Sequence, residues 1–221
     1  MIKEKNMAAV KKEKKELTKE KLTSLYMDDV LVKAQAPGTV FKFCKENKIT
    51  EEDFYKHFGS FEALEQAVWT QFFDHSLDLM QNSSEYAAFS EREKLLTFYF
   101  TFFEVLKANR SYVLFVLNKD KKPLMNLDQL KGLRSEVKDF AKSIDDDSQV
   151  KLLKSSVVFA EAVWLQLLFL LKFWKNDNSP QFESTDVAIE KSVNTLFDLF
   201  NTAPLERVLD LGKFLWKEKM S

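Results

Sequence analysis

Hydrophobic residues recur at helical spacing along most of this chain. Steps of three and four residues, typical of the buried face of a helix, predict helices over about 17–33, 61–80, 126–144, 151–174, 185–201 and 205–217. A further helix is expected after the capping signal Ser90-Glu91-Arg92-Glu93. Residues 111–118 (SYVLFVLN) fit a short buried helix, although periodicity alone does not exclude a strand. We therefore expect an all-α fold of about ten helices.

Residues 39–64 (TVFKFCKENKITEEDFYKHFGSFEAL) contain two short helical patterns joined by a turn at 46–48. Ile49 follows the turn, and we expect its apolar side chain to fill the small core between the two helices. Thr50, with Asp53 three residues later, forms an acidic variant of the capping box. Phe54 and Phe58 lie four residues apart and so share one helical face. Two helices joined by a short turn predict a helix-turn-helix unit.

The composition is rich in aromatic residues and nearly neutral in net charge. The 221 residues include 21 Phe but only four Gly and four Pro, which favours long helices over turns. The net charge of −1 gives no overall attraction to nucleic acid. Residues 1–21 nevertheless carry eight Lys against four Glu, either as a solvated charged segment or as an arm that reaches a phosphate backbone. No apolar signal segment follows them, so we expect a cytoplasmic protein.

Candidate chemistry is sparse. Cys44 is the single cysteine, and its place on an apolar face favours a buried residue over a nucleophile. With two histidines, no metal-spaced His/Cys set and no Gly-rich phosphate loop, we expect no enzyme, no metal and no cofactor. The run SVVFAEAVWLQLLFLLKF invites a transmembrane interpretation. Glu161, Gln166 and the nearby charges favour a buried helix of a soluble protein without a membrane span.

Residues 39–64 resemble the helix-turn-helix of the TetR family of bacterial transcriptional regulators. The matching positions are the threonine that opens the first helix, Ile49-Thr50 after the turn, and the two runs FYKHF and GSFEAL. The resemblance implies an all-helical homodimer with a DNA-binding domain and a second domain that holds a small apolar effector. It implies a charged arm over 1–21, a helix-turn-helix domain over 22–60 and a ligand-binding and dimerisation domain over 61–221.

The resemblance also implies that Thr39, Thr50, Asp53, Tyr55, Lys56 and His57 meet DNA, and we expect the basic residues Lys42 and Lys48 of the same stretch to meet it as well. The chain departs from the family pattern with Asn47-Lys48 in the turn and with Glu51 and Glu52 after the cap. Over 39–65 four Lys face six acids, a balance of −2 where phosphate contacts are needed. A second hypothesis therefore stays open. It is a TetR-fold protein that has lost DNA binding and binds a lipid or isoprenoid-type ligand, or that acts as a dimeric interaction module.

Aromatic side chains behind the helix-turn-helix predict an apolar pocket. The candidate lining residues are Phe72, Phe98, Phe102, Phe103, Phe115, Phe159, Trp164 and Phe169. Most of them also fit a filled core.

The helices expected at 151–174 and 185–201 have more apolar surface than one protomer needs. One stripe of the longer helix is Val157, Glu161, Trp164, Leu168 and Leu171, and another is Phe159, Val163, Leu167, Leu170 and Trp174. With one stripe turned to the partner, we expect an isologous four-helix interface. Its expected residues are Val157, Trp164, Leu168, Leu171, Ile189, Val193, Leu196 and Phe200. A DNA-binding dimer would space its recognition helices about 34–36 Å apart, and a ligand would change that spacing through the helix at 61–80.

Overall fold

The computed structural model describes residues 17–119, 123–146 and 156–202. Across these ranges the chain forms nine α-helices and four short 3₁₀ helices and contains no strand, so the all-α prediction is confirmed. The α-helices are α1 (Lys19–Lys33), α2 (Val40–Asn47), α3 (Glu51–Tyr55), α4 (Phe61–Gln81), α5 (Glu91–Ala108), α6 (Arg110–Lys119), α7 (Lys131–Asp146), α8 (Ser156–Lys175) and α9 (Glu183–Thr202). The 3₁₀ helices are η1 (Tyr86–Ala88), η2 (Leu124–Asn126), η3 (Asp128–Leu130) and η4 (Pro180–Phe182).

Helices α1 to α3, which we call the N-terminal unit, close around a small aromatic core. The ring of Phe54 in α3 lies 6.2 Å from that of Phe43 in α2 and 5.4 Å from that of Phe61 at the start of α4. Tyr26 of α1 completes the cluster, 5.6 Å from Phe61. One aromatic side chain from each helix therefore helps to fix their mutual orientation, and the two contacts of Phe54 are edge-on, as aromatic pairs favour.

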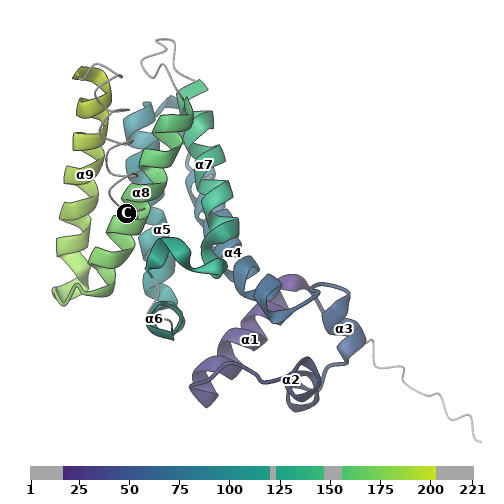
Figure 1. Cartoon of the computed structure of the whole chain (residues 1–221). Helices are drawn as coiled ribbons and strands as arrows, with labels where there is room; N and C mark the ends of the chain where they lie inside the picture. The colour runs from purple at the N-terminus through teal and green to yellow at the C-terminus, as the bar shows by residue number, and fades with distance from the viewer. Residues whose placement is uncertain (1–16, 120–122, 147–155, 203–221) are drawn as a thin grey trace, which may run out of the picture.

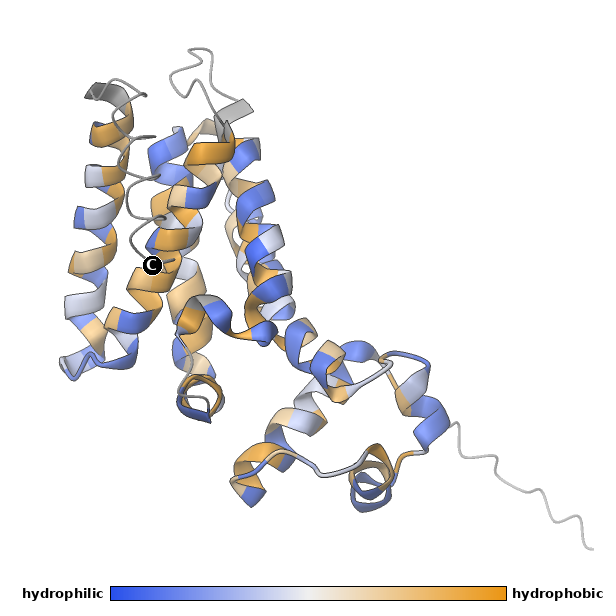
Figure 2. Cartoon of the chain, viewed as in Figure 1, coloured by the Kyte–Doolittle hydropathy of each residue, from blue (hydrophilic) through white to orange (hydrophobic). Residues whose placement is uncertain are grey.

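Helix α4 runs from the N-terminal unit into the rest of the molecule, which we call the body (Figure 1). The body is a bundle of α4, α5, α7, α8 and α9, with α6 at the end nearer the N-terminal unit. Helix α7 is polar on one side, whereas α8 is apolar along most of its length (Figure 2). Buried side chains of all these helices form one continuous hydrophobic cluster.

Several helix boundaries in the structure differ from those predicted from the sequence. The segment 111–118 is helical, within α6, and α2 continues through Asn47, so its turn begins at Lys48 (φ 57°). The helix expected at 126–144 begins only at Lys131, because η2 and η3 occupy its first residues. Helix α9 begins at Glu183, directly after Phe182 adopts a positive φ of 67°. The arm over 1–16, the first residues of the helix expected at 151–174 and the helix expected at 205–217 lie outside the described residues.

Candidate nucleic-acid interface and the surfaces of the body

The helix-turn-helix is held by side-chain caps. Thr39 Oγ1 accepts from the Lys42 amide at 3.2 Å and begins α2. Thr50 Oγ1 accepts from the Asp53 amide at 3.0 Å, while Asp53 Oδ2 accepts from the Thr50 amide at 3.4 Å. This reciprocal capping box, predicted from the sequence, begins α3. The five-residue α3 therefore has a defined start despite its shortness.

The acids of α3 lie on its outer side. Phe54 and Phe58 are buried, whereas Glu51 and Glu52 are exposed and Tyr55 is 53% exposed. In the buried Cys44, burial raises the pKa of the thiol, and the charges of Glu51 and Asp53 raise it further. The thiolate that a nucleophile requires is thus disfavoured at Cys44.

Besides the capping residues Thr39 and Thr50, three of the eight expected DNA contacts are engaged inside the chain. Asp53 caps α3, and Lys56 Nζ lies 3.3 Å from Glu52 Oε1 and 3.7 Å from Asp53 Oδ1. The bond to Glu52, and then its charge, raises the pKa of Lys56. His57 Nε2 is 2.5 Å from the carbonyl oxygen of Leu17. Because a carbonyl only accepts, Nε2 carries the proton and ties the entry of α1 to the end of α3.

Thr39, Lys42, Lys48 and Thr50 are exposed, like Tyr55. They lie on α2, α3 and the turn between them, at the end of the molecule away from the body (Figure 1). Phe41, not expected among the contacts, is 60% exposed, with Lys45 Nζ 5.9 Å from its ring centre. The outer face of the unit therefore mixes lysines, acids and exposed aromatic rings.

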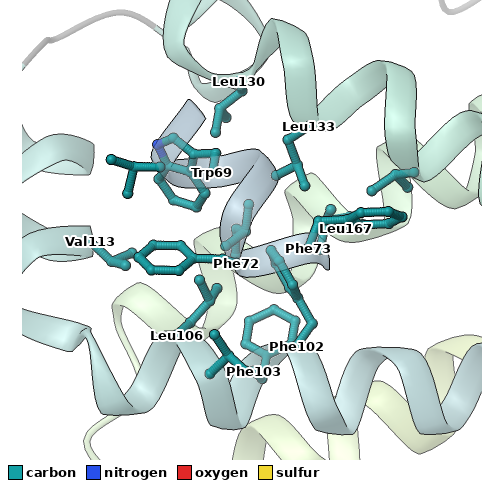
Figure 3. Packing of buried hydrophobic residues seen from close by; sticks show 14 of the residues in the cluster. Trp69, Phe72, Phe73, Phe102, Phe103, Leu106, Val113, Leu130, Leu133 and Leu167 are labelled. Atoms are coloured by element: carbon teal, nitrogen blue, oxygen red, sulfur yellow. The ribbon is translucent and has the colours of Figure 1, made fainter. Parts of the chain in front are cut away.

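Most of the expected pocket residues are core residues, and Figure 3 shows three of them, Phe72, Phe102 and Phe103, within the packed cluster. Phe98 is fully buried, and its ring centre lies 4.9 Å from that of Phe140 and 5.5 Å from those of Phe73 and Phe102. Buried positions are also held by Phe72, Phe102, Phe103, Phe159 and Trp164, while Phe115 is partly buried and Phe169 is 54% exposed. The residues on α4 and α5 come together, whereas Phe159 packs instead on α9 through Phe197 and Phe200.

Two surface hollows meet at Phe169. One, of about 450 Å³, lies between α8 and α9 and is lined by Gln166, Phe169, Ala188, Lys191, Ser192, Thr195, Leu196 and Leu199. The other, of about 570 Å³, lies at the end of α8 and includes Phe173, Asn176 and Ser184. Both are open to solvent, so Phe169 borders a surface groove rather than an enclosed chamber.

Both predicted stripes of α8 are directed mainly toward their own protomer. Of the expected interface residues, Trp164, Leu168, Leu171, Ile189, Val193 and Phe200 are buried within one chain, Leu196 is partly buried and Val157 is 58% exposed. A third stripe faces outward: Leu165, Phe169 and Phe173 are 51%, 54% and 38% exposed. The sequence shows that these three residues are four positions apart. Because α8 is apolar all round, however, its sequence does not indicate which stripe stays outside the core of the protomer.

The segment Val157–Lys175 is long and apolar enough to cross a membrane, yet 56% of its most apolar window is buried inside the protein. A core helix passes the same test, so the segment is no clear membrane span. Within the described ranges no three His, Cys, Asp or Glu side chains are grouped to hold a metal ion.

Sequence reasoning missed a polar junction between the N-terminal unit and the body. The hydroxyl of Tyr26 in α1 donates to Glu65 Oε1 of α4, and Lys119 Nζ of α6 lies 3.7 Å from the same oxygen. Tyr112, also on α6, is buried beside them. These residues are too far apart in sequence for any local pattern to join them.

A helix-turn-helix followed by a larger helical bundle defines the chain as an all-helical protein of two parts. Residues 94–215, more than half of the chain, match a family model described as the tetracyclin repressor-like C-terminal domain. The chain belongs to this TetR family. The match begins in α5 and does not include the helix-turn-helix. No curated protein and no solved structure matches the chain.

Proposed function

We propose that the chain is a TetR-family transcriptional regulator that binds DNA as a homodimer and responds to a small apolar ligand. Residues 1–21 act as the arm, 22–60 as the DNA-binding domain and 61–221 as the ligand-binding and dimerisation domain. The observation that carries the proposal is the capped helix-turn-helix joined to this family's C-terminal domain. Regulators of this family are generally not enzymes.

Two of the three acids of α3 make side-chain contacts within the fold. Asp53 serves the capping box and Glu52 pairs with Lys56, which leaves Glu51 as the main uncompensated charge among these three. The lysine-rich arm enters the fold at Leu17, whose carbonyl is bonded to His57 at the end of α3. The arm thus joins beside the recognition helix and supplies phosphate contacts that α3 lacks.

The alternative is a TetR-fold protein that has lost DNA binding and binds a lipid or isoprenoid-type ligand. It is favoured by the exposed Glu51 and Glu52, because phosphate contacts normally dominate affinity for DNA. The two functions differ in whether the acids of α3 lie against the phosphates of DNA, and this difference can be measured.

Gel retardation on the DNA upstream of the chain's own coding sequence separates them. The expected result is retention at about 50 mM salt that weakens steeply by about 200 mM. Replacing Glu51→Gln and Glu52→Gln should tighten binding at least several-fold. The matched control Glu85→Gln with Glu136→Gln removes the same charge from exposed positions of the body and should change affinity far less.

No retention even at about 50 mM salt, where phosphate contacts are strongest, would contradict DNA binding, and an equal effect of the α3 and body substitutions would contradict the role of α3 in that binding. The second result would show that only net charge matters and that α3 does not meet the DNA.

The proposed dimer uses the outward stripe of α8 with Leu196 and Leu199 of α9. Leu165, Phe169 and Phe173 form a row of apolar side chains that one protomer leaves in water, next to the groove between α8 and α9. Covering this row with the same row of a second copy gives a two-fold, four-helix interface. This interface uses the two helices expected from the sequence, α8 and α9, but a different face of α8.

The proposed effector binds among the aromatic side chains between α4, α5 and α7. Because Phe98 already touches Phe73, Phe102 and Phe140, a ligand there has to separate rings in contact. Binding would therefore expand the body and move α4. Mass spectrometry of protein extracted from cells, with thermal-shift assays using acyl and quinone probes, tests this. Ligand-free protein that no probe stabilises would contradict it.

A further inference from the structure

One carboxylate lies where three helices meet. The ring of Tyr26 belongs to the aromatic core of the N-terminal unit, 6.2 Å from Phe43, and its hydroxyl reaches out of that core to Glu65 of α4. The Glu65 side chain is only 13% exposed. This bond joins α1 to α4 at the base of the body, so it resists rotation of the N-terminal unit about the start of α4.

Helix α6 turns one face toward the same carboxylate, and this face carries Lys119 and, seven residues earlier, Tyr112. Lys119 Nζ is 3.7 Å from Glu65 Oε1, the oxygen that also accepts from Tyr26. Tyr112 is 1% exposed, and its hydroxyl has no hydrogen-bond partner in the part of the chain that the structure describes. Burial raises the pKa of Tyr112, and the Glu65 charge adds to the rise.

An unpaired buried hydroxyl is costly, because folding removes its water without a replacement. The described arrangement therefore satisfies Tyr26 and leaves Tyr112 unsatisfied. A displacement of α6 that brings the Tyr112 hydroxyl to Glu65 would satisfy Tyr112 and change the surroundings of the bond to α1. Such an exchange gives two discrete states, which coupling between distant sites requires.

We propose that Glu65 is a two-position acceptor that links the N-terminal unit to the body, bonded to Tyr26 in the described state and to Tyr112 when α6 shifts. Glu65 is then a positioning residue: it decides whether α1 is fastened to α4 or released. The biological use of this link rests on the proposed function, in which the N-terminal unit reads DNA. The exchange itself is a property of the free protein.

A double-mutant cycle measured by thermal unfolding of the full chain tests the exchange. Tyr112→Phe removes the unsatisfied hydroxyl and should raise the melting temperature by roughly 2–4 °C, the shift expected for one such group in a chain of this size. Tyr26→Phe should lower it by a similar amount. In the Tyr26→Phe background, where Tyr112 takes over Glu65, Tyr112→Phe should lower the melting temperature further.

We therefore expect Tyr112→Phe to raise the melting temperature in the native background and to lower it in the Tyr26→Phe background. Glu65→Gln should make this reversal smaller. Tyr99→Phe is the matched control, because the Tyr99 hydroxyl donates to the Val163 carbonyl far from the junction. It should lower the melting temperature equally in both backgrounds. If Tyr112→Phe stabilises both backgrounds, Tyr112 never uses Glu65. If it destabilises both, Tyr112 is bonded in the described state. Either result overturns the proposal.

Gel retardation of the same variants keeps the two proposals apart. A native chain that binds no DNA but shows the reversal would overturn the proposed function and leave the exchange intact. A chain that binds DNA while Tyr26→Phe and Tyr112→Phe act additively would overturn the exchange and leave the function intact. Under both proposals, the two substitutions should shift DNA affinity in opposite directions.

Discussion

Helix α3 and helix α8 use their exposed surfaces in opposite ways. Helix α3 buries Phe54 and exposes Glu51 and Glu52, so its outer face is charged. Helix α8 buries most of its circumference and still exposes Leu165 and Phe169. In both helices the buried side chains hold the fold, whereas the exposed ones determine which partner the surface could bind under the proposed function. An acidic face disfavours phosphate, and an apolar row favours another protein surface.

Helix α6 packs on α1 of the N-terminal unit and on α5 of the body, and side-chain contacts also attach it to the end of α8. The Arg110 guanidinium stacks 4.3 Å from the Trp174 ring and 4.2 Å from the Phe182 ring. At the other end of α6, Lys175 Nζ donates to the Leu117 carbonyl at 3.0 Å. Two contacts thus hold α6 on the end of α8, while Glu65 and its neighbours form its polar link to α4.

The largest expected effect separates buried from exposed aromatic residues. Phe98→Ala should cost about 3–5 kcal/mol of unfolding free energy, because it opens a cavity among four packed rings. Phe41→Ala, at an exposed position of the N-terminal unit, should stay within about 0.5 kcal/mol. Urea unfolding followed by circular dichroism measures both. Similar losses would mean that Phe41 is covered in solution.

The next effect concerns the outward row of α8. Leu165→Glu with Phe169→Glu should weaken dimerisation by about 100-fold or more, because two charges would have to be buried in the interface. Light scattering at micromolar protein should then report a monomer. Leu79→Glu, at a 49% exposed leucine of α4, is the control and should leave the dimer unchanged. A double variant that stays dimeric would place the interface elsewhere.

A smaller effect is expected at the capping box. Thr50→Ala should cost about 1 kcal/mol, since the Asp53 amide loses its acceptor. Thr50→Ser keeps the hydroxyl and should recover most of that loss. Hydrogen exchange of the α3 amides, compared with those of α8, shows whether the loss is local. Unchanged exchange in α3 would mean that tertiary packing, rather than the cap, holds this helix.

The smallest effect is pH-dependent and lies in the turn between α8 and α9. Burial would raise the pKa of Asp177, but bonds from Thr185 and Ser179 outweigh it and hold the pKa below its usual range. Its stabilisation is therefore complete above the ordinary aspartate pKa of about 3.9 and is lost as the pH falls through the lowered value. The difference in urea midpoint between native chain and Asp177→Asn should stay constant from pH 7 to 5 and shrink below pH 4. A difference that persists at low pH would contradict this.

Local patterns predicted the fold well. The capping box at Thr50, the apolar side chain of Ile49 and the buried pair Phe54 and Phe58 are all local features, and all depend on spacing within one or two turns. Helix boundaries moved where an irregular turn intervened, as at Phe182, because no propensity scale anticipates a positive φ at a bulky residue.

The surfaces were predicted less well. The α8 stripes at Trp164 and Phe159 are turned toward the protomer, and the outward stripe at Phe169 emerged only with the packing of α7 and α9. The junction at Glu65 joins three helices through residues 26, 65 and 112–119. Tertiary structure alone brings such groups together, so a single sequence holds no periodic signal for them.

The bond between His57 and the Leu17 carbonyl has a practical consequence for handling the protein. Any polypeptide joined on the N-terminal side of Leu17 enters the fold beside the end of α3. A tag or fluorescent fusion on that side competes with a duplex for this face, and a negative retardation result would then report the tag. Experiments on nucleic-acid binding should therefore use protein from which any leading tag has been cleaved.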